Sequence, residues 1–185
     1  VSRATLHNED FINEKQLGIG DRCIISKAGD IIPEVVRVVK HCENSKVYKL
    51  PDVCPSCGNK TVREEGEAAV RCINPECPAQ FIRNLIHFCS RDAMDIEGMG
   101  DAVVETFVEK GFIKTTPDIF NLDREKISEI DRMGEKSADN LIAAAEKSKG
   151  NDLYRLVYAL GIRHIGQKAA KLLCDKFGDM GSVMS

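Results

Sequence analysis

Four cysteines place the strongest constraint on what this chain can fold into. Cys54 and Cys57 form a Cys-x2-Cys pair, fourteen residues follow, and Cys72 and Cys77 form a Cys-x4-Cys pair. Zn²⁺ prefers four soft ligands at the corners of a tetrahedron, and two short cysteine knuckles can supply two corners each. We therefore predict one structural zinc ion per chain, held by all four thiolates. Two disulfides or a redox-active pair are the alternatives.

The segment that holds these cysteines, residues 51–79, is short and punctuated by Pro and Gly. Its spacer has room for a hairpin with arms at 61–63 and 69–71 and a turn at 65–67. The chain has eight cysteines in total, too few for a small secreted disulfide scaffold, so we expect a reduced, cytoplasmic protein. The other four are predicted to be small buried hydrophobic residues: Cys23, Cys42, Cys89 and Cys174.

Residues 1–50 have the composition of strands. The segments 23–26 and 34–39 are rich in β-branched residues, and the turn between them, 27–30, contains a glycine. A short helix is predicted over 9–16, capped at its start by Asn8-Glu9-Asp10. Because two or three strands make no stable sheet alone, we interpret this part as the rear of a small β-barrel whose front is missing.

Residues 80–185 change to helical periodicity. Apolar residues recur at i, i+3 and i+4 from Phe81 to Cys89, which predicts an amphipathic helix. Further helices are predicted at about 101–110, 118–130, 135–149, 152–160 and 166–177. Four glycines stand where helices would end in a left-handed cap: Gly111, Gly150, Gly161 and Gly178.

An approximate internal repeat runs through the helical part. Its three copies share an Ile, two residues, an apolar residue and a Gly, and the closing glycines Gly100, Gly134 and Gly166 are 34 and 32 residues apart. Each glycine lies between two predicted helices, where the free amides and the dipole of the following helix favour an anion. Three ordinary helix-to-helix turns are the alternative. The repetition at near-constant spacing favours DNA-backbone binding.

Further residues of the repeat support this interpretation. Gly98 precedes the first closing glycine and would let the backbone approach a phosphate closely. Lys136 and Lys168 fall in the first turns of the second and third copies, where each can add a charged contact. Arg132 and His164 stand where those copies would have the leading glycine, which weakens the case for contact there.

The lengths of the apolar runs, the motifs and the net charge bear on other classes of protein. No apolar run approaches the roughly 18 residues that span a bilayer. No catalytic constellation, P-loop or Lys-x-Asp-Gly nucleotidyl-acceptor pattern is present. The chain has 26 Lys and Arg against 29 Asp and Glu, a formal charge of −3, which at first argues against nucleic acid. Backbone amides at helix N-termini can hold phosphates with few added cations, so DNA is not excluded.

Several segments together resemble the bacterial NAD-dependent DNA ligase family: "VSRATLHNEDFI", "GIGDRCIISKAGDIIPEVVRVV", "CPSCG…RCINPECPAQ", "HFCSRDAMDIEGMGDAVVETFVEKG" and "MGEKSADNLIAAAEKSK…LVYALGIRHIGQKAAKLL". The resemblance covers essentially the whole chain. It implies a multi-domain α+β protein: a partial OB-fold barrel at 1–50, a four-cysteine zinc finger at 51–79 and an all-α helix-hairpin-helix bundle at 80–185. It also implies that the family's domains continue beyond both ends.

The resemblance further implies a function. Members of the family adenylate a lysine from NAD, pass AMP to the 5′-phosphate at a nick, and seal the nick when the 3′-hydroxyl displaces AMP. This chain would supply the grip on nicked duplex DNA, as a monomer in the bacterial cytoplasm at the nucleoid, and would be inactive alone. NAD and Mg²⁺ would bind elsewhere in the parent enzyme. Arg3, Lys27 and Arg37 are expected to contact DNA near the nick. A non-enzymatic DNA-binding scaffold and an RNA-binding zinc-ribbon protein are the alternatives.

Overall fold

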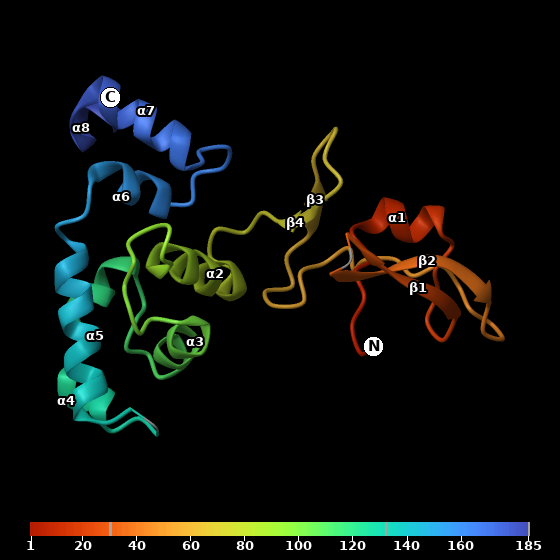
Figure 1. Cartoon of the computed structure of the whole chain (residues 1–185), viewed down its shortest axis with the longest axis horizontal. Coiled ribbons are helices and arrows are strands. Elements are labelled where there is room, and N and C mark those ends of the chain that lie inside the picture. The colour runs from red at the N-terminus through yellow and green to blue at the C-terminus, as the bar shows by residue number, and fades with distance from the viewer. Residues whose placement is uncertain (30, 132, 185) are drawn as a thin grey trace. The chain divides into compact units, whose positions relative to one another are not determined.

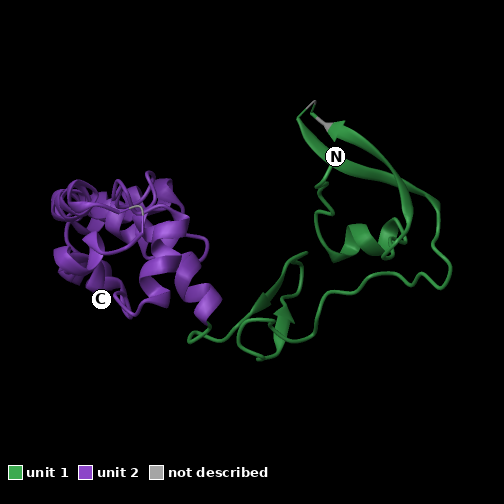
Figure 2. Ribbon diagram, turned by 90° about the horizontal axis from the view of Figure 1, so that it is seen from below, with its two compact units in different colours: residues 1–77 green, residues 78–185 purple. Residues whose placement is uncertain are grey.

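The computed structural model describes residues 1–29, 31–131 and 133–184 and forms two compact units, Val1–Cys77 and Pro78–Ser185 (Figure 2). Three residues named in the predicted motifs or boundaries lie outside the described residues: Asp30, Arg132 and Ser185. The described residues contain helices and two separate two-stranded antiparallel sheets, without a closed barrel. The predicted α+β class is confirmed, and the division at 50/51 and 79/80 stays a prediction.

A curled two-stranded ribbon is the largest regular element of the first unit (Figure 1). Strand β1 (Arg22–Ala28) pairs antiparallel with β2 (Ile32–Lys40), with register shifts after Arg22 and after Ile24. Both strands extend slightly beyond the predicted segments. Such irregularities increase the local twist, as the curved strands of a small barrel require.

Helix α1 (Glu9–Glu14) packs beside this ribbon. Its N-cap is Asn8, whose side-chain oxygen accepts a hydrogen bond of 2.9 Å from the amide of Phe11, as the sequence predicted. The helix ends two residues before the predicted end at residue 16. Three buried side chains form the small core beneath it: Ile12, Leu17 and Val35.

The cysteine-rich segment forms the predicted hairpin. Strand β3 (Thr61–Arg63) pairs antiparallel with β4 (Val70–Cys72), so that Thr61 lies opposite Cys72. The second arm is displaced by one residue from the predicted 69–71. The displacement brings Cys72 into the strand, and the hairpin therefore holds this thiol in a fixed position.

The second unit is helical throughout. Most predicted helices are present within two or three residues of their expected ends: α2 (Pro78–Cys89), α3 (Asp101–Glu109), α5 (Glu135–Ser148), α6 (Leu153–Ala159) and α7 (Gln167–Phe177). A further short helix, α8 (Met180–Met184), was not predicted. One continuous apolar core, which includes Leu85, Phe107 and Leu141, connects α2, α3 and α5. No helix among the described residues is long and apolar enough to cross a membrane.

The single helix predicted at 118–130 is wrong. The segment divides into a 3-10 helix, η1 (Thr116–Asn121), and a short α-helix, α4 (Arg124–Ser128). Asp123 starts the second helix, because its side chain accepts hydrogen bonds from the amides of Glu125 and Lys126. A strong capping residue inside an apolar periodic segment therefore restarts the helix rather than continuing it.

Three of the four predicted glycine caps have a positive φ: Gly111, Gly161 and Gly178. Gly150 does not, because α5 ends in an ordinary turn in which the Gly150 amide donates to the carbonyl of Lys147. Among the scattered cysteines, Cys89 is buried but Cys42 is exposed, so the prediction of a buried Cys42 is wrong. Cys42 follows β2 and lies in the loop after the ribbon rather than in the core.

Candidate metal centre and nucleic-acid interface

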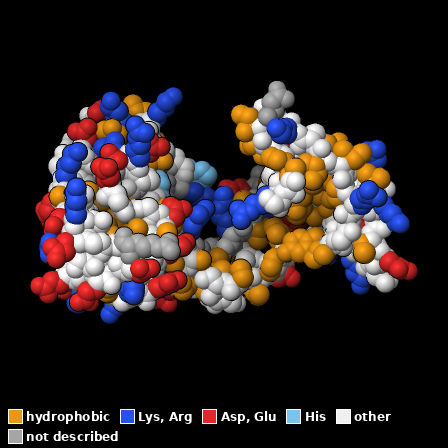
Figure 3. All heavy atoms as spheres, turned by 60° about the horizontal axis from the view of Figure 1, so that its bottom comes forward, with side chains coloured by type: hydrophobic (Ala, Val, Ile, Leu, Met, Phe, Trp, Pro, Cys, Tyr) orange, Lys and Arg blue, Asp and Glu red, His pale blue; other side chains and the backbone are white. Residues whose placement is uncertain are grey.

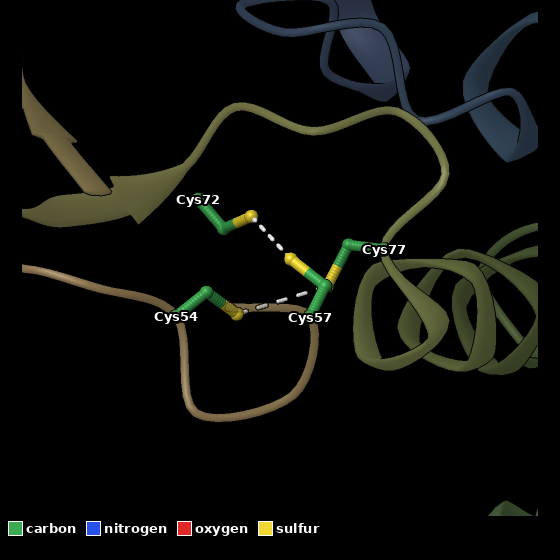
Figure 4. A group of neighbouring side chains, drawn as sticks. All are labelled: Cys54, Cys57, Cys72 and Cys77. Atoms are coloured by element: carbon green, nitrogen blue, oxygen red, sulfur yellow. Dashed lines mark hydrogen bonds between the residues drawn. The ribbon is translucent and has the colours of Figure 1, made fainter. Parts of the chain in front are cut away.

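The four cysteines of the knuckles converge on one point (Figure 4). All four sulfur atoms lie within 4.8 Å of one another, with 3.8 Å between the sulfurs of Cys54 and Cys77 and 3.5 Å between those of Cys57 and Cys72. A zinc ion about 2.3 Å from four tetrahedral sulfurs would separate them by about 3.8 Å. A disulfide needs about 2.05 Å. The arrangement therefore fits a four-thiolate zinc site and does not fit two disulfides.

Backbone hydrogen bonds hold the first knuckle, Cys54 to Cys57, in this geometry. The amide of Gly58 donates to the carbonyl of Cys54 at 2.8 Å, and the amide of Cys54 donates to Asn59 at 2.7 Å. Gly58 has a φ of 72°, a left-handed conformation that closes the turn without the steric cost of a Cβ. Asn59 also donates a side-chain hydrogen bond to the sulfur of Cys57 at 3.6 Å.

The electrostatics of the cluster favour a cation at its centre. The backbone amide of Asn59 lowers the pKa of Cys57 to about 6. The amide of Asn74 acts to lower the pKa of Cys72, but burial and the neighbouring sulfurs outweigh it and raise that pKa to about 11. Four thiols this close cannot all ionise on their own, because each thiolate repels the next. A divalent metal removes this conflict by deprotonating the thiols that coordinate it.

An ion pair joins the cysteine hairpin to α1. Arg63 of β3 donates from Nη1 and Nη2 to the two carboxylate oxygens of Asp10 at 2.7 and 2.5 Å, and from Nε to the carbonyl of Glu67 at 2.7 Å. The hydrogen bond from Arg63 holds the pKa of Asp10 below its usual value. Nothing in the sequence indicated this pair, because its partners are 53 residues apart.

Three helices of the second unit begin in the same way. We call α2–α3 the first hairpin, α4–α5 the second and α6–α7 the third. The helices α3, α5 and α7 have the N-caps Gly100, Gly134 and Gly166, with φ/ψ of −72/169°, −81/176° and −81/175° and no side-chain cap hydrogen bond. A Cβ built at any of these glycines would meet no atom within 4 Å. Each helix therefore presents uncapped amides at an open surface, which is the geometry of an anion site.

The residue two positions before each N-cap shapes the turn. Gly98 in the first hairpin has a φ of 91°, and His164 in the third has a φ of 66°. His164 therefore adopts a left-handed backbone although it is not glycine, at a cost of about 1 kcal/mol. The missing leading glycine does not abolish the turn of the third hairpin. The corresponding Arg132 lies outside the described residues.

The basic residues predicted to contact DNA are all exposed. Lys136 and Lys168 lie in the first turns of α5 and α7, beside the open amides. Arg3, Lys27 and Arg37 belong to the first unit, where Lys27 lies on β1 and Arg37 on β2. The contact of these last three residues with DNA stays a prediction.

The ribbon of the first unit also exposes apolar side chains, which gather on this unit in Figure 3. Ile32 and Val39 of β2 are 56% and 52% exposed. A cavity of about 340 Å³ opens beside the small core and is lined mostly by apolar side chains, including Leu6 and Tyr48. The apolar character agrees with strands that form part of a larger sheet or barrel.

Comparison with known proteins matches the parts of the chain separately. Residues 1–47 match the NAD-dependent DNA ligase OB-fold domain, and residues 53–79 match the NAD-dependent DNA ligase C4 zinc finger domain. Residues 90–147 match the SAM-like helix-hairpin-helix tandem, and residues 155–185 match the helix-hairpin-helix motif.

Curated relatives match over nearly the whole chain. The protein named DNA ligase of Acetivibrio thermocellus is 53% identical over 100% of this chain, and that of Symbiobacterium thermophilum is 51% identical over 99%. The DNA ligase of Bacillus subtilis is also 51% identical over 99%. The chain spans 28% of the length of each of these relatives.

Proposed function

The chain belongs to the NAD-dependent DNA ligase family, and we propose that it is the part of such an enzyme that holds nicked duplex DNA. The observation that carries this proposal is the threefold repetition of an open glycine N-cap, at Gly100, Gly134 and Gly166. Each site would receive one phosphate of the DNA backbone. Phosphate contacts of this kind position a protein on the duplex without reading its sequence.

Backbone amides supply most of the recognition in this proposal. The positive ends of α3, α5 and α7 face the phosphates, and Lys136 and Lys168 add charge-assisted contacts in two of the three sites. Such sites depend on local geometry rather than on net charge. A chain with a formal charge of −3 can therefore bind a polyanion.

The zinc site supports this grip from the first unit. Four thiolates close the coordination sphere and leave no position for a substrate, so the zinc ion is structural. The ion pair between Arg63 and Asp10 connects the finger to α1 in the OB-fold segment. We propose that Arg3, Lys27 and Arg37 contact the DNA backbone or minor groove from this segment, close to the nick.

The chemistry of nick sealing would belong to other parts of the parent enzyme. The chain has no Lys-x-Asp-Gly pattern and therefore no candidate lysine to carry AMP. NAD and Mg²⁺ would serve that lysine and not the residues described above. We expect the 185-residue chain to bind nicked DNA as a monomer and to seal no nicks.

Fluorescence anisotropy with a labelled nicked duplex tests the DNA-binding proposal. The zinc-loaded chain should bind at 50 mM salt, lose affinity steeply towards 200 mM, and show no sequence preference. The double variant Lys136→Gln/Lys168→Gln should bind less tightly and with a shallower salt dependence. Lys110→Gln/Lys149→Gln is the matched control, because both lysines are exposed at the opposite, C-terminal ends of their helices, α3 and α5. Absence of binding by the unchanged chain at 50 mM salt would refute the proposal.

A further inference from the structure

The connector between α2 and α3, residues 90–100, is held by side chains from far along the chain. The backbone carbonyls of Arg91, Asp92 and Met94 each accept a hydrogen bond from a side chain that lies 57 to 75 residues later in the sequence. This connector forms the turn of the first hairpin and ends at the open N-cap of α3.

The three donors all come from the third hairpin and the residues that lead into it. Asn151, just before α6, donates from Nδ2 to Met94 at 2.7 Å. Arg155 of α6 donates from Nη2 to Arg91 at 2.6 Å. Gln167, the first residue of α7, donates from Nε2 to Asp92 at 2.9 Å. The last bond is the most informative, because Gln167 directly follows the glycine N-cap of the third hairpin.

The connector is itself held to the first hairpin by hydrogen bonds and apolar packing. Its amides at Met94 and Ile96 donate to carbonyls at the end of α2, each at 3.0 Å. The side chains of Ala93, Met94, Ile96 and Met99 are buried in the core of the second unit. A side chain that donates a hydrogen bond to this connector is therefore bound to the first hairpin as a whole.

A fourth contact joins the same two hairpins through their first helices, α2 and α6, which lie in contact. The Nε2 atom of His87 on α2 is 2.9 Å from the carbonyl of Tyr158 on α6, and the rings of the two residues meet edge to face at 4.8 Å. Bonds therefore tie the hairpins together at both ends of α6, so the hairpins cannot pivot about one contact.

We propose that the first and third hairpins form a single two-site grip, and that Asn151 and Gln167 are positioning residues that fix the distance between its two phosphate sites. This inference rests on the proposed DNA binding and concerns how two of its three sites cooperate. When the sites are held at a fixed spacing, a phosphate bound by one places a second phosphate at the other with little further loss of entropy. When the link is loose, each hairpin binds separately.

The test uses the neutral donors, because removal of Arg155 would itself change the charge and the salt dependence. Asn151→Ala/Gln167→Met deletes both side-chain amide-to-carbonyl bonds and leaves the net charge unchanged. Asn121→Ala is the matched control: its amide also donates to a carbonyl, that of Pro117 at 3.3 Å, but within η1. Far-UV circular dichroism and thermal melts establish that each variant is folded at the temperature of the binding assay. If the double variant is not folded, the single variant Gln167→Met replaces it in the binding assay.

Binding to nicked duplex is measured by anisotropy across a salt series. The two-site grip predicts about tenfold weaker binding by the double variant and a log–log salt slope shallower by about one, because Lys168 beside Gln167 no longer neutralises its phosphate in every complex. The control should retain both values. A purely structural role would lower the melting temperature and leave the affinity and slope of the folded variant unchanged, and this result would overturn the inference alone. Failure of the unchanged chain to bind would overturn both the inference and the proposed function.

Discussion

Removal of zinc should unfold one part of this chain and spare another. Between residues 51 and 77 the only buried hydrophobic side chains are those of Cys54 and Cys77, which are themselves metal ligands. Burial of two such small side chains stabilises a fold by at most a few kcal/mol. A structural zinc ion bound by thiolates contributes about 10–16 kcal/mol of apparent binding free energy at neutral pH. The metal, and not apolar packing, must therefore stabilise the finger.

In the second unit, apolar packing and not metal binding stabilises the fold. Its core contains large side chains that are essentially inaccessible, among them Phe107, Leu85 and Ile127, and none of its described residues belongs to the four-cysteine cluster. We therefore expect α2, α3 and α5 to keep their structure when the metal is removed. The expected outcome is a chain with an unfolded finger and a folded helical unit.

Hydrogen exchange before and after chelation measures this directly. The holo chain should contain about one zinc per molecule, and its paired amides in β3 and β4 should be protected. After treatment with a strong chelator under reducing conditions, protection should vanish around Val62 and Arg71 and persist in α3 and α5. Persistent protection of the finger in a metal-free chain would refute the reasoning. So would global unfolding, which would show that the two units share one cooperative transition.

Three further predictions concern the folded chain. Phe107→Ala should destabilise the second unit by about 3–5 kcal/mol in chemical denaturation, because Phe107 is fully buried, and a loss below 1 kcal/mol would contradict the described core. Gly98→Ala should cost about 1–2 kcal/mol from its φ of 91° alone, since a Cβ there would find ordinary contacts with Leu141 at 3.8 Å, and an unchanged melting temperature would contradict that backbone. Asp10 has a lowered pKa in the folded chain, so its contribution to stability is present above the unfolded value near 3.8 and is lost as the pH falls through the folded value. Asp10→Asn should remove that part of the acid sensitivity in melts from pH 5 to pH 2, and an unchanged profile would show that the pair with Arg63 has no such role.

Local features of this fold could be predicted from the sequence. The knuckle spacing identified all four members of the sulfur cluster, and Asn8 marked the start of α1. These predictions succeed because a knuckle or a cap is formed by residues within a few positions of one another. The failure at 118–130 also concerns a local cap. Apolar periodicity continues through Asp123, and only the side chain of that residue shows that a new helix begins there.

Contacts between distant segments could not be predicted in this way. Arg63 and Asp10, or Gln167 and Asp92, are ordinary surface residues in the sequence, and none lies in a recognisable pattern. Their partners are defined only after helices and strands have packed. The exposure of a single side chain could not be predicted either: Cys42 was expected to be buried because cysteine is usually buried, but it is exposed.

The choice of N-cap residue differs within this one chain. Asn8 and Asp123 cap α1 and α4 with side-chain hydrogen bonds, whereas α3, α5 and α7 begin at glycines that leave their amides open. A side-chain cap would stabilise those helices by a few tenths of a kcal/mol relative to glycine, so stability does not explain the glycines. We propose instead that glycine at these N-caps leaves room for an anion.

Gly166→Asp separates these two explanations. The φ of −81° suits any residue and a Cβ there meets no atom within 4 Å, so the variant should fold with an unchanged or slightly higher melting temperature. Its carboxylate would occupy the amides of α7 and repel a phosphate, and binding to nicked duplex should weaken markedly. Gly166→Ser, a neutral cap, should weaken binding less. If the aspartate variant bound DNA as tightly as the unchanged chain, the open amides of the third hairpin would not be a phosphate site.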